Sequence, residues 1–299
     1  MQNDRTLLQV KNLKKYFPIK KGVFRKVHGY VKAVDDVSFS IKKGETLSLV
    51  GESGCGKTTI GRLILRAIKA TSGEIIFHLS DKEVKINKLH ESELKDFRKY
   101  MQLIFQDPYS SLNPRMTVLE IIGEPLLVNR VASGKVLEDR VVELMELVGL
   151  NSKYLRRYPH AFSGGQRQRI GVARALALNP ELVIADEPVS ALDVSIQAQI
   201  LNLLKDIQQK QNLTYFFISH DLSVVEYISD TVAVMYVGQI VEIAKTKNIF
   251  NHLKHPYTEA LLSAVPRIDP GEKRERYFLS GEVADPANPP DGCYFHPRC

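Results

Sequence analysis

The feature that most constrains the fold is a glycine-rich run, Gly51-Glu-Ser-Gly-Cys-Gly-Lys57-Thr58. A short apolar segment, residues 46–50, precedes the run as a predicted buried strand, and a helical pattern from residue 57 to about 69 follows it. This strand–loop–helix order is the context that a phosphate-binding loop requires. Glycines let backbone amides approach phosphates closely, and the start of the helix adds positive potential. The run therefore predicts a nucleotide site formed by Gly51, Glu52, Ser53, Gly54, Cys55, Gly56, Lys57, Thr58 and Thr59.

Two residues of this loop have predicted roles of their own. Lys57 is expected to reach the β- and γ-phosphates, and the hydroxyl of Thr58 is expected to hold Mg²⁺. The alternative interpretation is a chance glycine-rich turn, and the flanking strand and helix argue against it.

A second motif places two carboxylates after an apolar strand, Leu182-Val-Ile-Ala-Asp186-Glu187. The carboxyl ends of strands are where open α/β sheets hold ligands. Asp186 is predicted to bind Mg²⁺ through water, and Glu187 to orient or deprotonate an attacking water. Adjacent residues of a strand face opposite sides, so this division of roles is plausible.

The rest of the chain predicts an α/β core interrupted by a mainly helical insert at about residues 107–178. Thr117-Val-Leu-Glu120 has the pattern of a capping box, and Val136–Leu150 places its apolar residues on one helical face before Gly149. A helix capped by Ser163 is expected to run to about Leu178. In the last thirty or so residues the periodicity fades, which indicates a tail or a small appended module.

Composition narrows the class of protein. The 299 residues are 44% hydrophobic, which suits a large globular core in one large or two modest domains. No apolar run has the length of a transmembrane helix, and the polar N-terminus lacks the pattern of a signal peptide. We therefore expect a soluble, cytosolic chain that needs a partner for any role at a membrane. The net charge of +7 fits nucleic acid, an anionic membrane surface or simple solvation, and solvation is the favoured interpretation.

Five motifs in a fixed order carry a family resemblance. They are Gln106-Asp-Pro, Phe162-Ser-Gly-Gly-Gln166, Leu182–Glu187, Ser190-Ala-Leu-Asp193 and Ser219-His220-Asp221. Together with the phosphate loop they resemble an ATP-binding-cassette ATPase over residues 8 to about 265. The resemblance implies a P-loop NTPase (RecA-like) α/β core with an antiparallel β subdomain and the helical insert, in a domain spanning residues 1–265.

The resemblance also implies roles for the matching residues. Gln106 contacts Mg²⁺, and His220 touches the γ-phosphate and supports Glu187. Asp193 lies at a dimer contact. The helix start at Ser163, Gly164, Gly165 and Gln166 caps the γ-phosphate bound to a partner subunit, in keeping with the free amides of a helix N-terminus. Taken alone, Ser163 is an ordinary N-cap and His220 an ordinary histidine at a strand end.

The family also expects an aromatic ring on the adenine, near the end of the first strand. Tyr16 and Phe17 are both candidates. The spacing from Leu13 favours Phe17, whereas tyrosine is the commoner residue type. The alternative is a half-buried aromatic at a sheet edge.

The finer wording of the motifs resembles the ATPases of bacterial oligopeptide and dipeptide importers. It includes Ile104-Phe-Gln-Asp-Pro-Tyr-Ser-Ser-Leu-Asn-Pro-Arg115 and a C-terminal Asn288-Pro-Pro-Asp-Gly-Cys-Tyr-Phe-His-Pro-Arg-Cys299. The resemblance implies the F-type ATPase subunit, working with a second ATPase, two membrane permeases and an extracytoplasmic binding protein. It implies peripheral attachment to the cytoplasmic face of the membrane and no nucleic-acid partner. Glutathione or nickel-complex import is the nearer alternative, and a cassette ATPase acting on DNA or ribosomes the more distant one.

The tail at residues 266–299 resembles the C-terminal region of these transporters and looks incomplete. Some members carry a four-iron four-sulfur cluster there, bound by four cysteines. Cys293 and Cys299 are too few ligands for such a cluster. We therefore expect a cluster only where the chain continues beyond Cys299, and otherwise two free thiols.

Overall fold

The structure is a computed structural model that describes residues 5–22, 26–80, 82–263 and 279–299. The chain divides into two compact units, Met1–Leu89 with Ile218–Cys299 and His90–Phe217. The predicted domain boundary at residue 265 lies outside the described residues.

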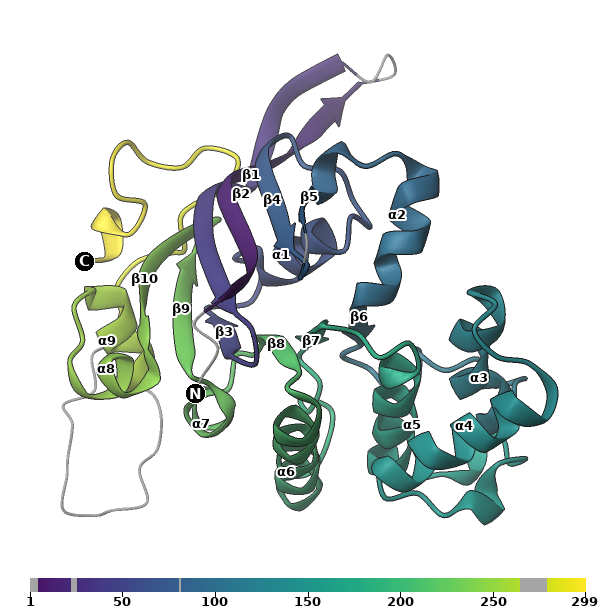
Figure 1. The fold of residues 1–299 in the computed structure, drawn as a ribbon. Coiled ribbons are helices and arrows are strands. Elements are labelled where there is room, and N and C mark those ends of the chain that lie inside the picture. Colours follow the sequence, from purple (N-terminus) through teal and green to yellow (C-terminus); the bar gives the residue numbers. More distant parts are fainter. Residues whose placement is uncertain (1–4, 23–25, 81, 264–278) are drawn as a thin grey trace, which may run out of the picture. The chain divides into compact units, whose positions relative to one another are not determined.

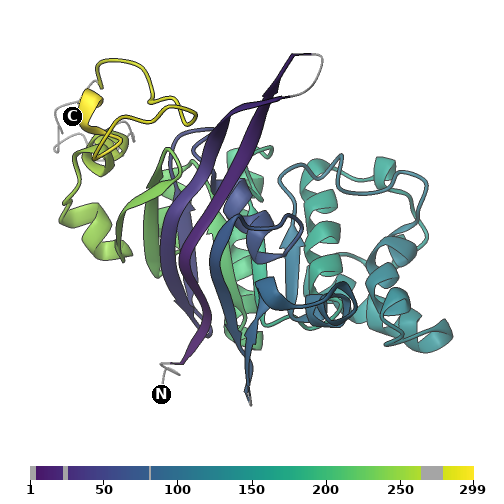
Figure 2. The ribbon, with the colours of Figure 1, turned by 90° about the horizontal axis from the view of Figure 1, so that it is seen from above.

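An antiparallel sheet forms one layer of the first unit (Figure 1). Its strand order is β2 (Lys26–Lys42), β1 (Thr6–Lys21), β4 (Ser72–His78) and β5 (Glu83–Lys85). All three pairings are antiparallel, which confirms the predicted β subdomain. Apolar and polar residues alternate only over residues 8–13 and 34–41, so the sequence predicts much shorter first and second strands. Figure 2 shows both running side by side into a long hairpin, where lysines on either face remove the alternation that marks a half-buried strand.

The phosphate loop belongs to a second layer of this unit. β3 (Thr46–Val50) is wholly buried and pairs in parallel with β9 (Thr231–Tyr236). β9 continues through a tight turn at Gly238 into the antiparallel strand β10 (Gln239–Lys245), and the apolar pattern of residues 231–243 predicts these two strands. β3 leads through the loop into α1 (Lys57–Ile64), which is shorter than predicted because Arg66 adopts the left-handed conformation, at φ +55°.

Short helices and a C-terminal segment complete the first unit. α7 (Leu222–Ile228), α8 (Thr246–Asn251) and α9 (Pro256–Ser263) contribute buried side chains to one core cluster with β9. The C-terminal segment, residues 279–299, ends in the 3₁₀ turn η5 (His296–Arg298). Tyr294 and Phe295 of this segment are buried against Tyr236 and Tyr257. The segment is therefore part of a core cluster and not a detached tail.

The second unit carries the helical insert. Its strands are β6 (Met101–Ile104), β7 (Leu182–Asp186) and β8 (Thr214–Ile218), and α2 (Glu91–Phe97) precedes them. α3 (Val118–Val128), α4 (Gly134–Leu147) and α5 (Gly164–Leu176) pack on one another, and α6 (Val194–Gln211) follows β7. The capping box between Thr117 and Glu120 and the buried face of α4 are as predicted. Within the described residues, no helix combines the length and apolarity needed to cross a membrane.

Candidate functional site

The phosphate loop closes tightly onto the neighbouring strand in the first unit. Gly56 is the N-cap of α1 at φ +112°, and a Cβ atom there would lie 2.1 Å from the carbonyl oxygen of Ala33. Both the conformation and the close approach require glycine. Thr58 and Thr59 follow in the first turn of α1, next to the backbone amides that a helix N-terminus leaves for an anion.

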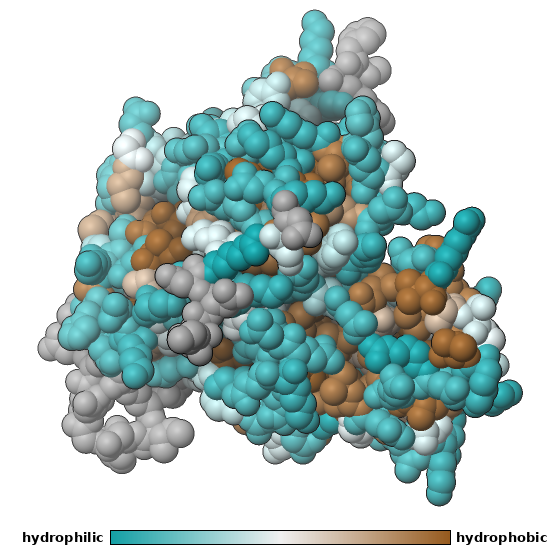
Figure 3. Space-filling model, viewed as in Figure 1, coloured by the Kyte–Doolittle hydropathy of each residue, from teal (hydrophilic) through white to brown (hydrophobic). Residues whose placement is uncertain are grey.

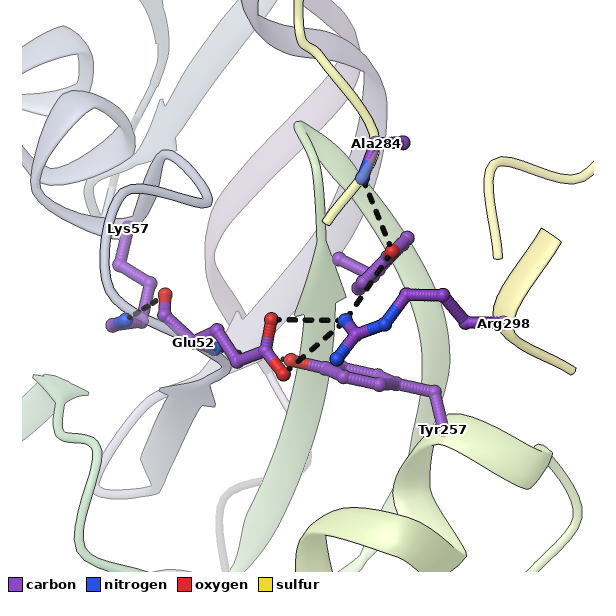
Figure 4. Close-up of polar contacts among 6 residues, drawn as sticks. Glu52, Lys57, Tyr257, Ala284 and Arg298 are labelled. Carbon is purple, nitrogen blue, oxygen red and sulfur yellow. Dashed lines mark hydrogen bonds and ion pairs between the residues drawn. The ribbon is translucent and has the colours of Figure 1, made fainter. Parts of the chain in front are cut away.

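Lys57 holds the loop together from inside (Figure 4). Its side chain is buried, and Nζ donates to the carbonyl oxygens of Gly51 at 2.7 Å and Glu52 at 2.9 Å. The ammonium group therefore stays within the loop that sequence reasoning assigned to phosphate. Cys55 lies beside it, and burial raises the pKa of the thiol. Cys55 is thus a small apolar filler in this loop.

Tyr16 and Phe17, the two candidates for stacking on adenine, have different surroundings in the structure. The hydroxyl of Tyr16 donates to the carboxylate of Asp35, and burial together with that bond raises the pKa of Tyr16 to about 12. Phe17 is 38% exposed, with Nζ of Lys15 at 4.8 Å from its ring centroid. Because neighbouring residues of a strand face opposite sides, Phe17 is the ring with an open face.

A cavity of about 250 Å³ adjoins the phosphate loop. The loop contributes Glu52 to Cys55, and residues 31–33 and 236–238 form further walls. The C-terminal segment supplies Val283 to Pro286. The predicted loop residues Ser53 and Gly54 thus face a hollow that the tail helps to enclose.

The second unit brings two predicted catalytic residues together. Nε2 of Gln106 donates to a carboxylate oxygen of Glu187 at 2.9 Å. Glu187 has the left-handed conformation, at φ +46°, directly after Asp186 ends β7. A non-glycine residue in this region stores about 1–3 kcal/mol of strain and is typical of functional sites.

The glycine-rich start of α5 has the predicted cap. Ser163 Oγ accepts from the backbone N–H of Gln166 at 3.4 Å, and Oε1 of Gln166 accepts from the N–H of Ser163 at 3.1 Å. A Cβ atom on Gly165 would lie 2.4 Å from Cγ2 of Ile196 in α6, whereas Gly164 has ordinary contact distances. Packing on α6 therefore requires Gly165. The amides of Gly164 and Gly165 lie in the first turn, where no helical carbonyl precedes them.

Other predicted residues fall on either side of the division between the units. His220 is exposed, between β8 and α7, in the first unit with Thr58. Asp193 in the second unit is the N-cap of α6 and accepts from the N–H of Ile196 at 3.0 Å. Gln106 and Glu187, in contrast, both belong to the second unit, and their contact lies within it.

Over residues 5–22, 26–80, 82–263 and 279–299, no group of three or more histidines, cysteines or acidic residues is placed to hold a metal ion. Cys293 and Cys299 are exposed free thiols. The cysteines present therefore do not fit a four-cysteine cluster.

Sequence reasoning missed four polar residues around the phosphate loop. Asp35 accepts from the hydroxyl of Tyr294 at 2.7 Å, and Tyr257 Oη accepts from the N–H of Glu52 at 3.0 Å. Arg298 pairs with the Glu52 carboxylate at 3.2 Å. The sequence offered one signal for these contacts, which is the presence of Tyr294 and Arg298 among the apolar and proline residues of the tail. Neither residue belongs to a periodic pattern that would predict its contacts.

Family comparisons agree with this geometry. Residues 34–190 match the family described as ABC transporter. The chain belongs to the ABC transporter ATPase family. Residues 241–299 match the family described as oligopeptide/dipeptide transporter, C-terminal region.

Relatives of this ABC ATPase align over nearly all of it. It is 55% identical to the oligopeptide transport ATP-binding protein AppF of Bacillus subtilis over 99% of this chain and 90% of that protein. It is 52% identical to the dipeptide transport ATP-binding protein DppF of Escherichia coli over 98% of this chain and 86% of that protein. A dimeric ATP-binding cassette solved in a post-hydrolysis state with ADP and Pi has a TM-score of 0.69 at 30% identity, covering 80% of this chain and 99% of the other. These matches confirm the predicted cassette fold and its ATPase activity.

Proposed function

We propose that this ABC ATPase energises the uptake of dipeptides or oligopeptides as the F-type ATPase subunit of an importer. The observation that carries the proposal is the match of residues 241–299 to the peptide-transporter C-terminal region. Relatives named for oligopeptide and dipeptide transport, including AppF and DppF, support it over the length of the chain. The C-terminal match therefore indicates the class of substrate, whereas the ATPase motifs indicate only ATP hydrolysis.

The proposed reaction uses the residues that the sequence motifs predicted. Lys57 binds the β- and γ-phosphates, Phe17 stacks on adenine, and His220 contacts the γ-phosphate. Gln106 holds the carboxylate of Glu187, and that carboxylate takes a proton from the attacking water. Thr58, Asp186 and Gln106 offer a hydroxyl, a carboxylate and an amide oxygen, which are the oxygen ligands that Mg²⁺ prefers. These residues would hold the ion, and the ion would offset the charge of the phosphates.

The helix start at Ser163 is proposed to act on a partner ATPase. Ser163, Gly164, Gly165 and Gln166 would cap the γ-phosphate held by the phosphate loop of the second cassette. Closure of the pair then depends on the γ-phosphate, and its loss on hydrolysis opens the pair again. ATP thereby drives a two-state switch. The solved dimeric relative with ADP and Pi is consistent with such a pair.

Two membrane permeases and an extracytoplasmic binding protein are the proposed further partners. The segment from Tyr109 to Met116 is our proposed permease contact, and Tyr109 is 60% exposed beneath the Arg167 guanidinium. Exposed Leu127, Val131 and Val136 form an apolar patch where α3 leads into α4 (Figure 3). Contiguous exposed apolar surface of this kind marks protein contacts. The proposed location is the cytoplasmic face of the membrane, reached through the permeases.

Partner identification tests the proposal. The chain would be tagged in its own host, solubilised gently, and its partners identified by mass spectrometry. Two permeases and a second cassette ATPase are expected, and the ligand of the associated binding protein separates peptide from glutathione or a nickel complex. A charge-reversal scan from residue 109 to 116 should reduce uptake. Ribosomal or DNA-bound partners without permeases would overturn the proposal and leave the ATPase alone.

A further inference from the structure

The C-terminal segment reaches the phosphate loop directly (Figure 4). Nη1 of Arg298 lies 3.2 Å and 3.4 Å from the two carboxylate oxygens of Glu52, and 3.5 Å from the hydroxyl of Tyr236. The side chains of Arg298 and Glu52 are 9% and 30% exposed. Water screens such a half-buried pair less than a surface pair, so the pair restrains the second residue of the loop.

The same segment reaches the strand that carries the aromatic candidates. Asp35 is buried and accepts from two tyrosine hydroxyls, one from Tyr294 and one from Tyr16. Burial raises the pKa of Asp35, but the two hydrogen bonds outweigh it and the pKa lies below its usual value. The carboxylate therefore joins the tail to β1 one residue before Phe17.

Apolar packing fixes the segment between these two contacts. The ring of Phe295 lies 5.3 Å from that of Tyr236 and 5.4 Å from that of Tyr257, centroid to centroid. The hydroxyl of Tyr257 in turn accepts from the backbone N–H of Glu52. Glu52 is thus held at its backbone by α9 and at its carboxylate by Arg298.

We propose that residues 279–299 form a brace that positions both ends of the nucleotide site. Arg298 positions the phosphate loop through Glu52, and Tyr294 positions the base-stacking strand through Asp35 and Tyr16. Arg298 and Tyr294 are positioning residues that act through other side chains. The inference rests on nucleotide binding at the phosphate loop. Because a pre-ordered site loses less freedom on binding, the brace raises the affinity for ATP without entering the chemical step.

Nucleotide titration of the full chain tests the brace. Arg298→Met should weaken the binding of a fluorescent MgATP analogue by about 5- to 20-fold. Saturating ATP should restore kcat to within about twofold of wild type, because uniform binding affects KM alone. Arg298→Lys should recover part of the loss, and Tyr294→Phe should weaken binding in the same way. Arg156→Met, at an arginine that is 81% exposed, is the matched control and should bind like wild type.

A double-mutant cycle separates the brace from general destabilisation. If Arg298 acts through Glu52, removing both side chains should cost no more than removing one. The double variant Glu52→Gln, Arg298→Met should therefore bind the MgATP analogue as well as whichever single variant binds it more weakly. Additive losses, or Arg298→Met binding as tightly as Arg156→Met, would overturn the proposal. Circular dichroism and urea unfolding of each variant establish that it is folded.

Hydrogen exchange gives a readout that a purely structural role would not move. Coupling is reciprocal, so if the brace favours nucleotide, nucleotide must slow amide exchange in residues 293–299 by a similar factor. Lys57→Ala, which removes the phosphate contact, should abolish that protection. Protection of the loop without protection of the tail would refute the brace. A wild-type chain that binds no nucleotide at all would instead refute the site on which the brace rests.

Discussion

At the scale of single residues, Glu187 combines two unusual features. It has a left-handed backbone at φ +46°, and its carboxylate accepts from Gln106 at 2.9 Å. The strained backbone fixes the direction of the side chain, and the amide fixes its rotation. A carboxylate whose side chain is fixed by its backbone conformation and by a hydrogen bond is suited to orienting one water molecule. The strain is therefore consistent with the proposed role in hydrolysis.

Glu187→Gln should retain ATP binding and lose turnover. The amide keeps the shape of the side chain but cannot take a proton, so hydrolysis should fall by about 100-fold or more. Phosphate release at saturating MgATP measures turnover, and gel filtration should show a closed pair accumulating with ATP. Lys57→Ala is the contrasting variant, which should fail to bind. Wild-type hydrolysis in the glutamine variant would remove Glu187 from catalysis.

At the scale of elements, the start of α5 serves two purposes at adjacent glycines. Gly165 gives the room in which Ile196 of α6 packs, and Gly164 leaves the first turn open. The sequence predicted both as anion-binding residues and gave no sign of this difference. Only the distance between two helices reveals that one of them is also required by packing.

Gly165→Ala should therefore destabilise the second unit by about 1–3 kcal/mol, the usual cost of overpacking. Ile196→Ala should recover much of that loss by removing the opposing Cγ2 atom. Gly171→Ala is the control on the same helix, because a Cβ atom there meets nothing within 4 Å. It should be neutral or stabilising by helix propensity. Denaturant unfolding measures the stability of Gly165→Ala, of Gly165→Ala combined with Ile196→Ala, and of Gly171→Ala. Equal stability of Gly165→Ala and Gly171→Ala would contradict the packing argument.

The turn before β3 supports a second prediction at this scale. The Glu45 carboxylate is 11% exposed, accepts from Nζ of Lys245 at 2.8 Å, and also bonds the hydroxyl of Thr231. Burial raises the pKa of Glu45, but these bonds outweigh it and hold the pKa below its ordinary value of 4.5. A carboxyl whose pKa is lower in the folded than in the unfolded chain stabilises the fold at pH values above its unfolded pKa. That stabilisation is lost as the pH falls through the folded pKa.

Glu45→Gln should thus cost about 1–3 kcal/mol at pH 7 and progressively less below the ordinary glutamate pKa. Urea unfolding across pH measures the difference from wild type. Glu74→Gln is the control, because its pair with Lys85 is solvent-exposed and should contribute no measurable stability. A difference for Glu45→Gln that did not shrink in acid would rule out the charged pair as its cause.

At the scale of the whole molecule, the predicted site residues are distributed over both units. The phosphate loop and His220 belong to one unit, and Gln106, Asp186, Glu187 and the start of α5 to the other. The proposed function assigns the phosphate loop to the phosphates of MgATP, and Gln106 and Asp186 to its cation. MgATP should therefore stabilise each of these groups of residues by mass action, by about 2.7 kcal/mol at 100 times Kd.

Hydrogen exchange with and without MgATP, read separately over residues 46–64 and 101–104, measures this effect. Slower exchange is expected in both segments of the wild type and in neither for Lys57→Ala. Protection confined to the first segment would contradict the assignment of Gln106 and Asp186 to the cation.

Local chemistry explains what the sequence predicted. The strand–loop–helix order, the cap at Thr117 and the buried face of α4 each depend on residues within one element. The length of the β1–β2 hairpin and the strain at Glu187 have no periodic signal. The contacts of the tail join residues that only the finished fold brings together. Arg298 and Asp35 were therefore beyond prediction from pattern alone.

The brace also sets an order of events during synthesis. Glu52 and Arg298 are separated by 246 positions in the chain. At about 5–20 residues per second, a ribosome makes Arg298 roughly 12–50 s after Glu52. Until then the Glu52 carboxylate lacks its contact with Arg298, so the proposed brace is incomplete and the nascent cassette should bind ATP more weakly. Synthesis of Arg298 thus becomes the step that completes the proposed brace, and chains released before that point should bind ATP more weakly than the finished cassette.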